Sequence, residues 1–173
     1  NEFLKELSFC RNDTNSYLRK LLPQENNEVL YDAINYAIFS GGKRFRAFLV
    51  IQAAKLFEIP KIRALQAASA IETTHTYSLV HDDLPSMDND DIRRGKPTVH
   101  IKWDEATAVL VGDALQAFAY QILSDKKTHP NSEVRLHLIK TLSEASGHNG
   151  MVLGQSKDLE EEKSVKSPQL KDI

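Results

Sequence analysis

The chain has 173 residues, of which 41% are apolar, a formal net charge of −2 and a pI of about 6.3. This length predicts one domain, residues 1–173, with enough apolar side chains to form a core. The near-neutral balance excludes a general attraction to nucleic acid or to anionic membranes, so any anion site must be built from clustered Lys and Arg.

Apolar residues recur at helical spacing along most of the chain, which predicts an all-α fold with no strands. The predicted helices span 2–22, 26–40, 44–57, 61–83, 104–124 and 133–160. Pro23, Gly41-Gly42 and Pro60 mark their breaks. Residues 91–103 are predicted to form a loop, since Gly95 and Pro97 interrupt them.

The last predicted helix contains Gly147, Gly150 and Gly154, each costing roughly 1 kcal/mol relative to Ala. Three glycines in one helix suggest a close helix crossing. The tail from 156 is charged and is expected to fray. Cys10 is the only cysteine, so no intrachain disulfide forms and a reducing compartment, the cytoplasm, is expected. No apolar run is long enough to cross a bilayer, and residues 1–20 carry charges unlike a signal peptide.

Five aspartates fall within ten residues after the Ala-rich helix: Asp82, Asp83, Asp88, Asp90 and Asp91. Carboxylates this close repel one another unless a cation neutralises them. Oxygen ligands without nearby Cys favour a hard cation, and Mg²⁺ suits a site that also admits phosphate oxygens. A solvated acidic loop is the alternative. An EF-hand is excluded, because loops counted from Asp82 or Asp88 lack the required Gly and Glu.

Basic residues gather at two places. Gly41-Gly42-Lys43-Arg44-Phe45-Arg46 stands at a predicted helix start, where backbone N–H groups and cations together form an anion site. Lys43 and Arg46 are three residues apart and are predicted to share a helix face. Arg93-Arg94 follows the acidic cluster directly. Solvated surface cations are the alternative for either group taken alone.

His75 lies seven residues before Asp82, two helical turns away on the same face. Ile71, His75, Ser78 and Asp82 form one stripe that leads to the acidic cluster. A diphosphate contact for His75 is therefore predicted. His81 is a weaker candidate, and the other histidines are interpreted as structural or solvent-facing.

Three motifs in this order and spacing resemble the trans-isoprenyl diphosphate synthases, most closely the bacterial-type farnesyl diphosphate synthases. They are Gly-Gly-Lys-Arg-Phe-Arg (41–46), the run from Glu72 to Asp88, and Arg-Arg-Gly-Lys-Pro-Thr (93–98). Gly112-Asp113 and Gly154-Gln155 with Asp158 add support. The resemblance covers nearly all of this chain but only somewhat over half of a typical family member.

The resemblance implies an antiparallel helical bundle around a deep apolar cavity, here incomplete at the C-terminus, and usually a homodimer. It implies a prenyltransferase that condenses isopentenyl diphosphate with dimethylallyl or geranyl diphosphate to give farnesyl diphosphate. In this family Asp82 and Asp88 would hold Mg²⁺, with Asp83 supporting, and Arg93 would contact the allylic diphosphate. The residues implied to bind isopentenyl diphosphate are Gly42, Lys43, Arg46, His75 and Arg94, and Gln155 would lie near the site.

Tyr77, five residues before Asp82, points along the cavity in this family, and with the neighbouring Ser78 it would limit product length. A plain core aromatic is the alternative for Tyr77. Geranylgeranyl diphosphate synthases share the same aspartate motif with its two additional residues. The product length therefore stays open between C15 and C20.

The family's second Asp-rich motif is absent from residues 1–173, so a polypeptide of these residues alone is expected to be inactive. Two other functions stay open. A class I terpene cyclase also uses Asp-rich Mg²⁺ chemistry, but it needs no isopentenyl site such as Lys43 and Arg46. A regulatory homologue without catalysis would be expected to lose the Asp and Arg motifs, which are intact here.

Overall fold

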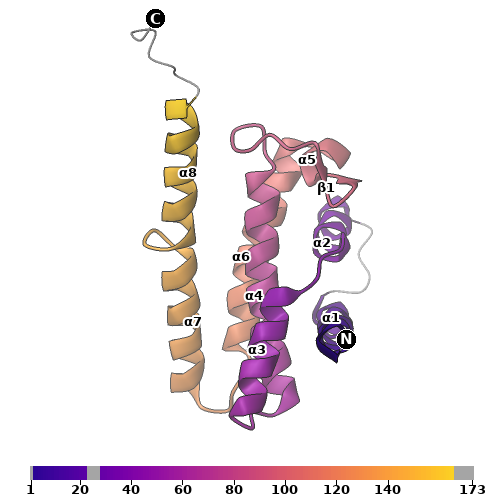
Figure 1. Ribbon diagram of the computed structural model, residues 1–173, viewed down its shortest axis with the longest axis vertical. Helices are drawn as coiled ribbons and strands as arrows, with labels where there is room; N and C mark the ends of the chain where they lie inside the picture. Colours follow the sequence, from indigo (N-terminus) through magenta and orange to yellow (C-terminus); the bar gives the residue numbers. More distant parts are fainter. Residues whose placement is uncertain (1, 23–27, 166–173) are drawn as a thin grey trace, which may run out of the picture.

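The computed structural model describes residues 2–22 and 28–165, and almost every element in these ranges is an α-helix (Figure 1). The helices are α1 (Glu2–Leu21), α2 (Val29–Phe39), α3 (Phe45–Leu56), α4 (Lys61–Asp82), α5 (Val99–Lys102), α6 (Glu105–Ser124), α7 (Ser132–Ser146) and α8 (Met151–Val165). The predicted all-α class is confirmed. The predicted break at Pro23, the predicted helix start at residue 26 and the tail from 166 lie outside the described residues.

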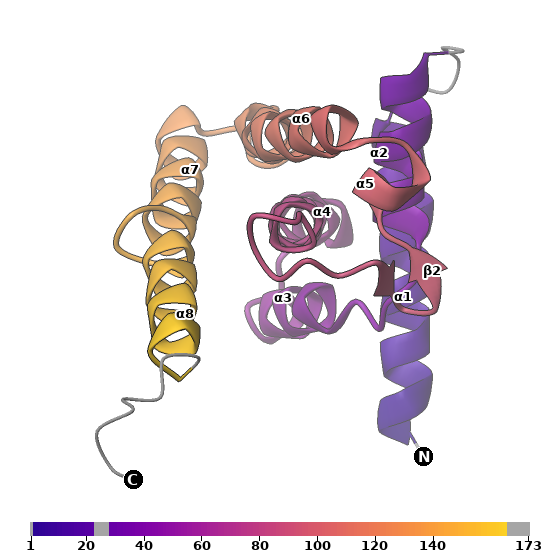
Figure 2. The same cartoon turned by 90° about the horizontal axis from the view of Figure 1, so that it is seen from above.

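The helices lie in three layers, which Figure 2 shows from above. α3, α4 and α6 run alongside one another in the middle, α1 and α2 cross them on one side, and α7 and α8 follow one another on the opposite side. α4 has its most extensive contacts with α6 and then with α3. It is therefore the central helix of the described chain.

α4 is rich in small residues, which lets its neighbours approach closely. Two of its buried threonines donate to the preceding turn: Thr73 Oγ1 to the Ser69 carbonyl (2.8 Å) and Thr76 Oγ1 to the Glu72 carbonyl (2.7 Å). These two hydroxyls are thus buried without the cost of an unmade hydrogen bond.

α6 is long and apolar enough to cross a membrane, judged by length and composition alone. This is weak support for a membrane span, because a helix buried in a protein core meets the same criterion. Here α6 buries Ala108, Val111, Gly112 and Leu115 within the folded chain.

Residues 91–103 were predicted to form a loop, but they contain regular secondary structure. Strands β1 (Ile92–Arg93) and β2 (Lys96–Pro97) pair antiparallel, so the expectation of no strands was wrong by this one short hairpin. Its two turn residues, Arg94 and Gly95, both have positive φ (55° and 75°), which favours a tight hairpin. The short helix α5 follows.

The prediction of a single helix over 133–160 was also wrong, because this segment forms two helices, α7 and α8. A Cβ at Gly147 would lie 2.6 Å from the Ser143 carbonyl oxygen, and one at Gly150 would overlap the Ala145 carbonyl. These glycines therefore permit a turn rather than a helix crossing. Gly154 has no neighbour within 4 Å, and α8 continues through the region predicted to fray.

Arg44 is the cation buried in the interior. Its guanidinium donates to Asn15 Oδ1 (3.0 Å), to Glu72 Oε2 (3.2 Å) and to the Ile38 carbonyl. Glu72 Oε1 in turn accepts from the Ala47 backbone N–H (3.0 Å). One ion pair, with both side chains 3% exposed, thus joins α1, α2, α3 and α4.

Replacing either partner of this ion pair would leave the other as an uncompensated buried charge. We expect Arg44→Met and Glu72→Gln each to lower the free energy of unfolding by about 3–5 kcal/mol. Urea unfolding followed by circular dichroism measures it. The control is Lys140→Ala, which removes an exposed pair with Glu144 and should cost less than about 0.5 kcal/mol. Equal losses in the three variants would contradict the assigned role.

Candidate active site

A cavity of about 500 Å³ opens where the α2–α3 loop faces α4 and the hairpin. We call it the cation cavity, because cations outnumber the one carboxylate among the charged, histidine and glycine residues that line it: Gly41, Gly42, Lys43, Arg44, Arg46, Glu72, His75 and Arg94. Three segments far apart in the sequence therefore meet there. Lys supplies a point charge and Arg a planar fork of donors, a combination suited to a polyanion such as a diphosphate.

Lys43 and Arg46 reach this cavity differently from the prediction. α3 begins only at Phe45, and Arg44 precedes it in the left-handed conformation (φ 53°). Lys43 therefore lies in the loop before the helix and not on a shared helix face. The left-handed turn at Arg44 directs its own side chain inward, while Lys43 and Arg46 stay exposed at the cavity.

Gly42 is required by the position of Arg94. Its φ is +117°, and a Cβ there would lie 2.6 Å from Arg94 Nη1. Arg94 Nη1 donates to the Gly41 carbonyl, so the glycine loop holds the hairpin turn at the cavity rim. Burial, and next the nearby Arg44, lower the pKa of Arg94 from its ordinary value.

His75 is half-buried in the wall of the cation cavity, and its Nε2 lies 3.3 Å from Arg46 Nη1. A guanidinium can only donate, so Nε2 must accept, and the imidazole is neutral. Burial, and next the charge of Arg46, lower the pKa of His75 to about 4. The structure thus brings His75 together with Arg46 and Arg94 at the cation cavity.

A second cavity, of about 330 Å³, lies further along the C-terminal half of α4. We call it the apolar cavity. Its lining combines residues of α4, the following loop and α8: Tyr77, Ser78, His81, Asp82, Met87, Met151, Val152, Gln155, Ser156 and Leu159. Ser78 and Asp82 of the predicted stripe therefore face this cavity, whereas His75 lines the cation cavity.

Asp82 lies in the lining of the apolar cavity. Burial, and next the negative charge of Asp88, raise the pKa of Asp82 to about 6. The two residues are close along the backbone, since the Asp88 N–H donates to the Asp82 carbonyl (2.8 Å). The Asp88 side chain is exposed.

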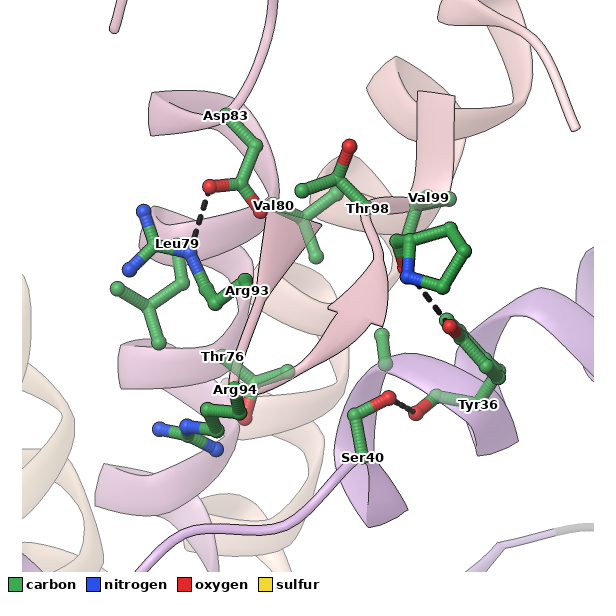
Figure 3. Close-up of a pocket in the computed structure, with 12 residues that line it drawn as sticks. Tyr36, Ser40, Thr76, Leu79, Val80, Asp83, Arg93, Arg94, Thr98 and Val99 are labelled. Atoms are coloured by element: carbon green, nitrogen blue, oxygen red, sulfur yellow. Dashed lines mark hydrogen bonds and ion pairs between the residues drawn. The ribbon is translucent and has the colours of Figure 1, made fainter. Parts of the chain in front are cut away.

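Asp83 points toward Arg93 of the hairpin, as Figure 3 shows. Arg93 Nε donates to Asp83 Oδ1 at 2.5 Å, and Arg93 Nη2 lies 3.3 Å from Asp90 Oδ2. Burial raises the pKa of Asp83, and the hydrogen bond from Arg93 opposes that rise. Arg93 is thus held by two carboxylates at the same end of α4.

The residues present fit a hard divalent cation in part. Asp82 and Asp88 supply oxygen donors, and burial, followed by the charge of Asp88, raises the pKa of Asp82. Within residues 2–22 and 28–165, however, no group of three or more His, Cys, Asp or Glu side chains converges. A cation here would need further ligands, such as phosphate oxygens and water.

Sequence reasoning missed the apolar residues of α8. Met151, Val152 and Leu159 line one cavity wall beside Gln155, which was predicted. Met151 and Leu159 lie on one helix face with Gln155, but the charged residues that follow Gln155 concealed this pattern. Arg44 was counted among the cations of an anion site, whereas it is the buried partner of Glu72.

A family model described as polyprenyl synthetase matches residues 27–172. The chain belongs to the polyprenyl synthetase family. It is 46% identical over 159 residues to the farnesyl diphosphate synthase of Haemophilus influenzae, covering 91% of this chain and 54% of that protein. It is 48% identical over 147 residues to the farnesyl diphosphate synthase of Micrococcus luteus, covering 85% and 49%.

The fold agrees with this family. The chain superposes with a TM-score of 0.87 on the crystal structure of an FPP/GFPP synthase from Zymomonas mobilis, at 46% identity, covering 96% of this chain and 60% of that one. A geranylgeranyl diphosphate synthase of Cyanophora paradoxa is 40% identical over 145 residues, covering 84% and 48%. The chain thus spans about half the length of the curated relatives it matches.

The depressed pKa of His75 predicts a pH-dependent stability. In the unfolded chain this imidazole takes up a proton near pH 6.5, but in the folded protein only near pH 4. The unfolded state binds more protons between these values, so His75 contributes stability above pH 6.5 that is lost as the pH falls through 4. In the His75→Gln variant, we expect the free energy of unfolding to fall less between these pH values, by on the order of 1–2 kcal/mol once solvent screening is counted.

Urea unfolding at pH 7, 5.5 and 4.5 compares wild type with His75→Gln. Asp82 acts in the opposite direction, because its pKa is raised on folding, so the difference between the two proteins is the readout. His137→Gln, on the exposed face of α7, is the matched control. Parallel curves for wild type and His75→Gln would show that His75 titrates normally.

Proposed function

We propose that the protein containing this chain is a Mg²⁺-dependent prenyltransferase that makes farnesyl diphosphate. It would join isopentenyl diphosphate head-to-tail to dimethylallyl diphosphate and then to geranyl diphosphate, releasing inorganic diphosphate each time. One observation carries the proposal: α4 lines both a cation cavity and an apolar cavity, and Asp82 lies at the edge of the apolar one. Two diphosphate substrates, one with a long apolar chain, require these two environments.

In this proposal the cation cavity holds isopentenyl diphosphate. Lys43, Arg46 and Arg94 would supply cations, and the backbone of Gly42 a close approach. The neutral His75 adds a polar contact without further positive charge. Gln155 would contact substrate from α8. These roles rest on the side chains that line the two cavities.

The allylic diphosphate would lie at the apolar cavity, with its hydrocarbon chain along Tyr77. The C1–O bond breaks and the electron pair leaves with the diphosphate, whose charge Arg93 helps to stabilise. The isopentenyl double bond then attacks the allylic C1, forming the new C–C bond, and loss of one proton gives the product double bond. The apolar walls exclude water, which would otherwise capture the cation.

Asp82 and Asp88 would hold Mg²⁺, which when bound neutralises the leaving diphosphate. Asp83 has a positioning role, because its hydrogen bond directs the Arg93 guanidinium. We further propose a homodimer in the cytoplasm, acting on small isoprenoid diphosphates and neither inserted in a membrane nor bound to nucleic acid. The single free Cys10, buried in α1, suits a reducing compartment.

The main alternative is a geranylgeranyl diphosphate synthase, favoured by the similarity to the Cyanophora paradoxa protein. The bulky Tyr77 at the apolar cavity supports the shorter C15 product. A terpene cyclase would leave the cation cavity without a use. A catalytically incompetent homologue would have no reason to keep both the aspartates and the cations.

Removing the charge of Asp82 tests the metal role. We expect Asp82→Asn in the full-length protein to lower kcat by about 10²–10³, because the leaving diphosphate loses its stabilisation. The assay separates C10 and C15 diphosphates after incubation with isopentenyl and dimethylallyl diphosphates and Mg²⁺. Asp32→Asn, exposed on α2, is the matched control. Wild-type kcat in Asp82→Asn would contradict the role.

The same assay serves two further comparisons. A wild-type protein that made no C10 or C15 diphosphate would exclude the proposed function. A polypeptide of residues 1–173 alone is expected to show no turnover, because the second Asp-rich motif of the family is not among these residues. Turnover by that polypeptide would contradict this expectation.

Replacing Tyr77 tests whether this residue limits the product length. We expect Tyr77→Ala to shift the products from C15 toward C20 and longer, because the missing ring lengthens the apolar cavity. Chromatography of the dephosphorylated alcohols measures the distribution. The control is Tyr31→Ala on α2, away from the cavity. An unchanged distribution in Tyr77→Ala would show that another residue limits the chain.

A further inference from the structure

His81 lies beside Asp82 in the sequence but makes contacts that the proposed reaction does not use. Its Nε2 lies 3.1 Å from the Val109 carbonyl oxygen on α6. A carbonyl only accepts, so Nε2 must carry the proton. The imidazole is therefore tied to the backbone of a neighbouring helix, at the wall of the apolar cavity.

Gly112, buried on α6, makes room for this ring. A Cβ at Gly112 would overlap the His81 Nε2, Cδ2 and Cε1 atoms. No other glycine in the described ranges has a histidine ring as its nearest neighbour. A glycine in a helix interior makes the helix less stable than an alanine would. Here the missing Cβ leaves space that the imidazole occupies. His81 and Gly112 thus form one contact, which we call the His81–Gly112 contact.

This contact bears on Tyr77, one helical turn earlier on α4. The two rings meet edge to face, with centroids 5.9 Å apart and an interplanar angle of 77°. Burial raises the pKa of Tyr77, and Gln116 is close enough to oppose that rise. The Tyr77 hydroxyl nevertheless forms no hydrogen bond of ordinary geometry within the described part of the chain. Side-chain packing, with the His81 ring as one neighbour, therefore orients the Tyr77 ring.

We infer that the His81–Gly112 contact determines product length by fixing the Tyr77 ring across the apolar cavity. His81 is a positioning residue, and Gly112 gives it its place. A fixed aromatic ring ends the cavity at a defined depth, whereas a ring that is free to turn would admit a longer hydrocarbon chain. This inference rests on the proposed function and on the proposed role of Tyr77.

A double-mutant cycle tests the contact itself. Gly112→Ala is expected to lower Tm by roughly 5 °C, because its methyl group displaces His81. In His81→Ala the ring is absent, so adding Gly112→Ala should cost little and the double variant should be more stable than Gly112→Ala alone. Gly154→Ala, where a methyl group meets no neighbour, is the control for the helical glycine. Additive changes in Tm would overturn the contact.

Product length tests what the contact does. In the full-length protein, His81→Ala and Gly112→Ala should each raise the share of C20 product at least about threefold, in the same direction as Tyr77→Ala. Loss of stability alone would lower the total yield without changing its distribution. His137→Ala, a helical and exposed histidine, should change neither.

The outcomes separate the two claims. A shift in Tyr77→Ala with unchanged products in both contact variants would overturn the inference and leave the role of Tyr77 intact. A wild-type protein without prenyl diphosphate product would overturn the proposed function, and with it the link to product length. The Tm cycle would still support or overturn the contact in that case.

Discussion

The ion pair of Arg44 with Glu72 is the interaction on which the rest of this structure depends. Two charges removed from water are tolerated only when every donor and acceptor finds a partner. Here Asn15, the Ile38 carbonyl and the Ala47 N–H complete that set. These partners come from different helices, so the requirement for complete pairing fixes how the first four helices meet.

The same ion pair shapes the cation cavity. Because Arg44 turns inward in a left-handed conformation, the chain on either side of it presents Lys43 and Arg46 outward. The glycine loop before it then closes on Arg94. The buried ion pair therefore sets the positions of the exposed charges that are proposed to bind a ligand.

Much of this was predictable from the sequence. The 3.6-residue period of apolar residues located the helices, and the two-turn separation of His75 from Asp82 placed both along one helix. The polyprenyl synthetase family follows from motifs whose order and spacing are specific. These are local properties, since a helix brings residues three, four and seven apart onto one face.

What the sequence left undetermined depends on contacts between distant segments. Arg44 resembles its neighbours Lys43 and Arg46, and only the presence of Glu72 opposite distinguishes it. Asp83 resembles Asp82, but the hairpin places Arg93 beside it. The break at Gly147 to Gly150 depends on carbonyl groups of the preceding turn. Pairings of this kind are decided by tertiary structure and not by residue type.

The continuous hydrogen bonding of α4 has one more consequence. His75 and Asp82 belong to the two cavities, and seven residues of an α-helix advance about 10 Å. Covalent geometry and main-chain hydrogen bonds fix that separation, so they set the distance between the two proposed diphosphate regions. Loops can move and side chains can turn, but the distance between the charged ends of the two proposed substrates depends on the pitch of one helix.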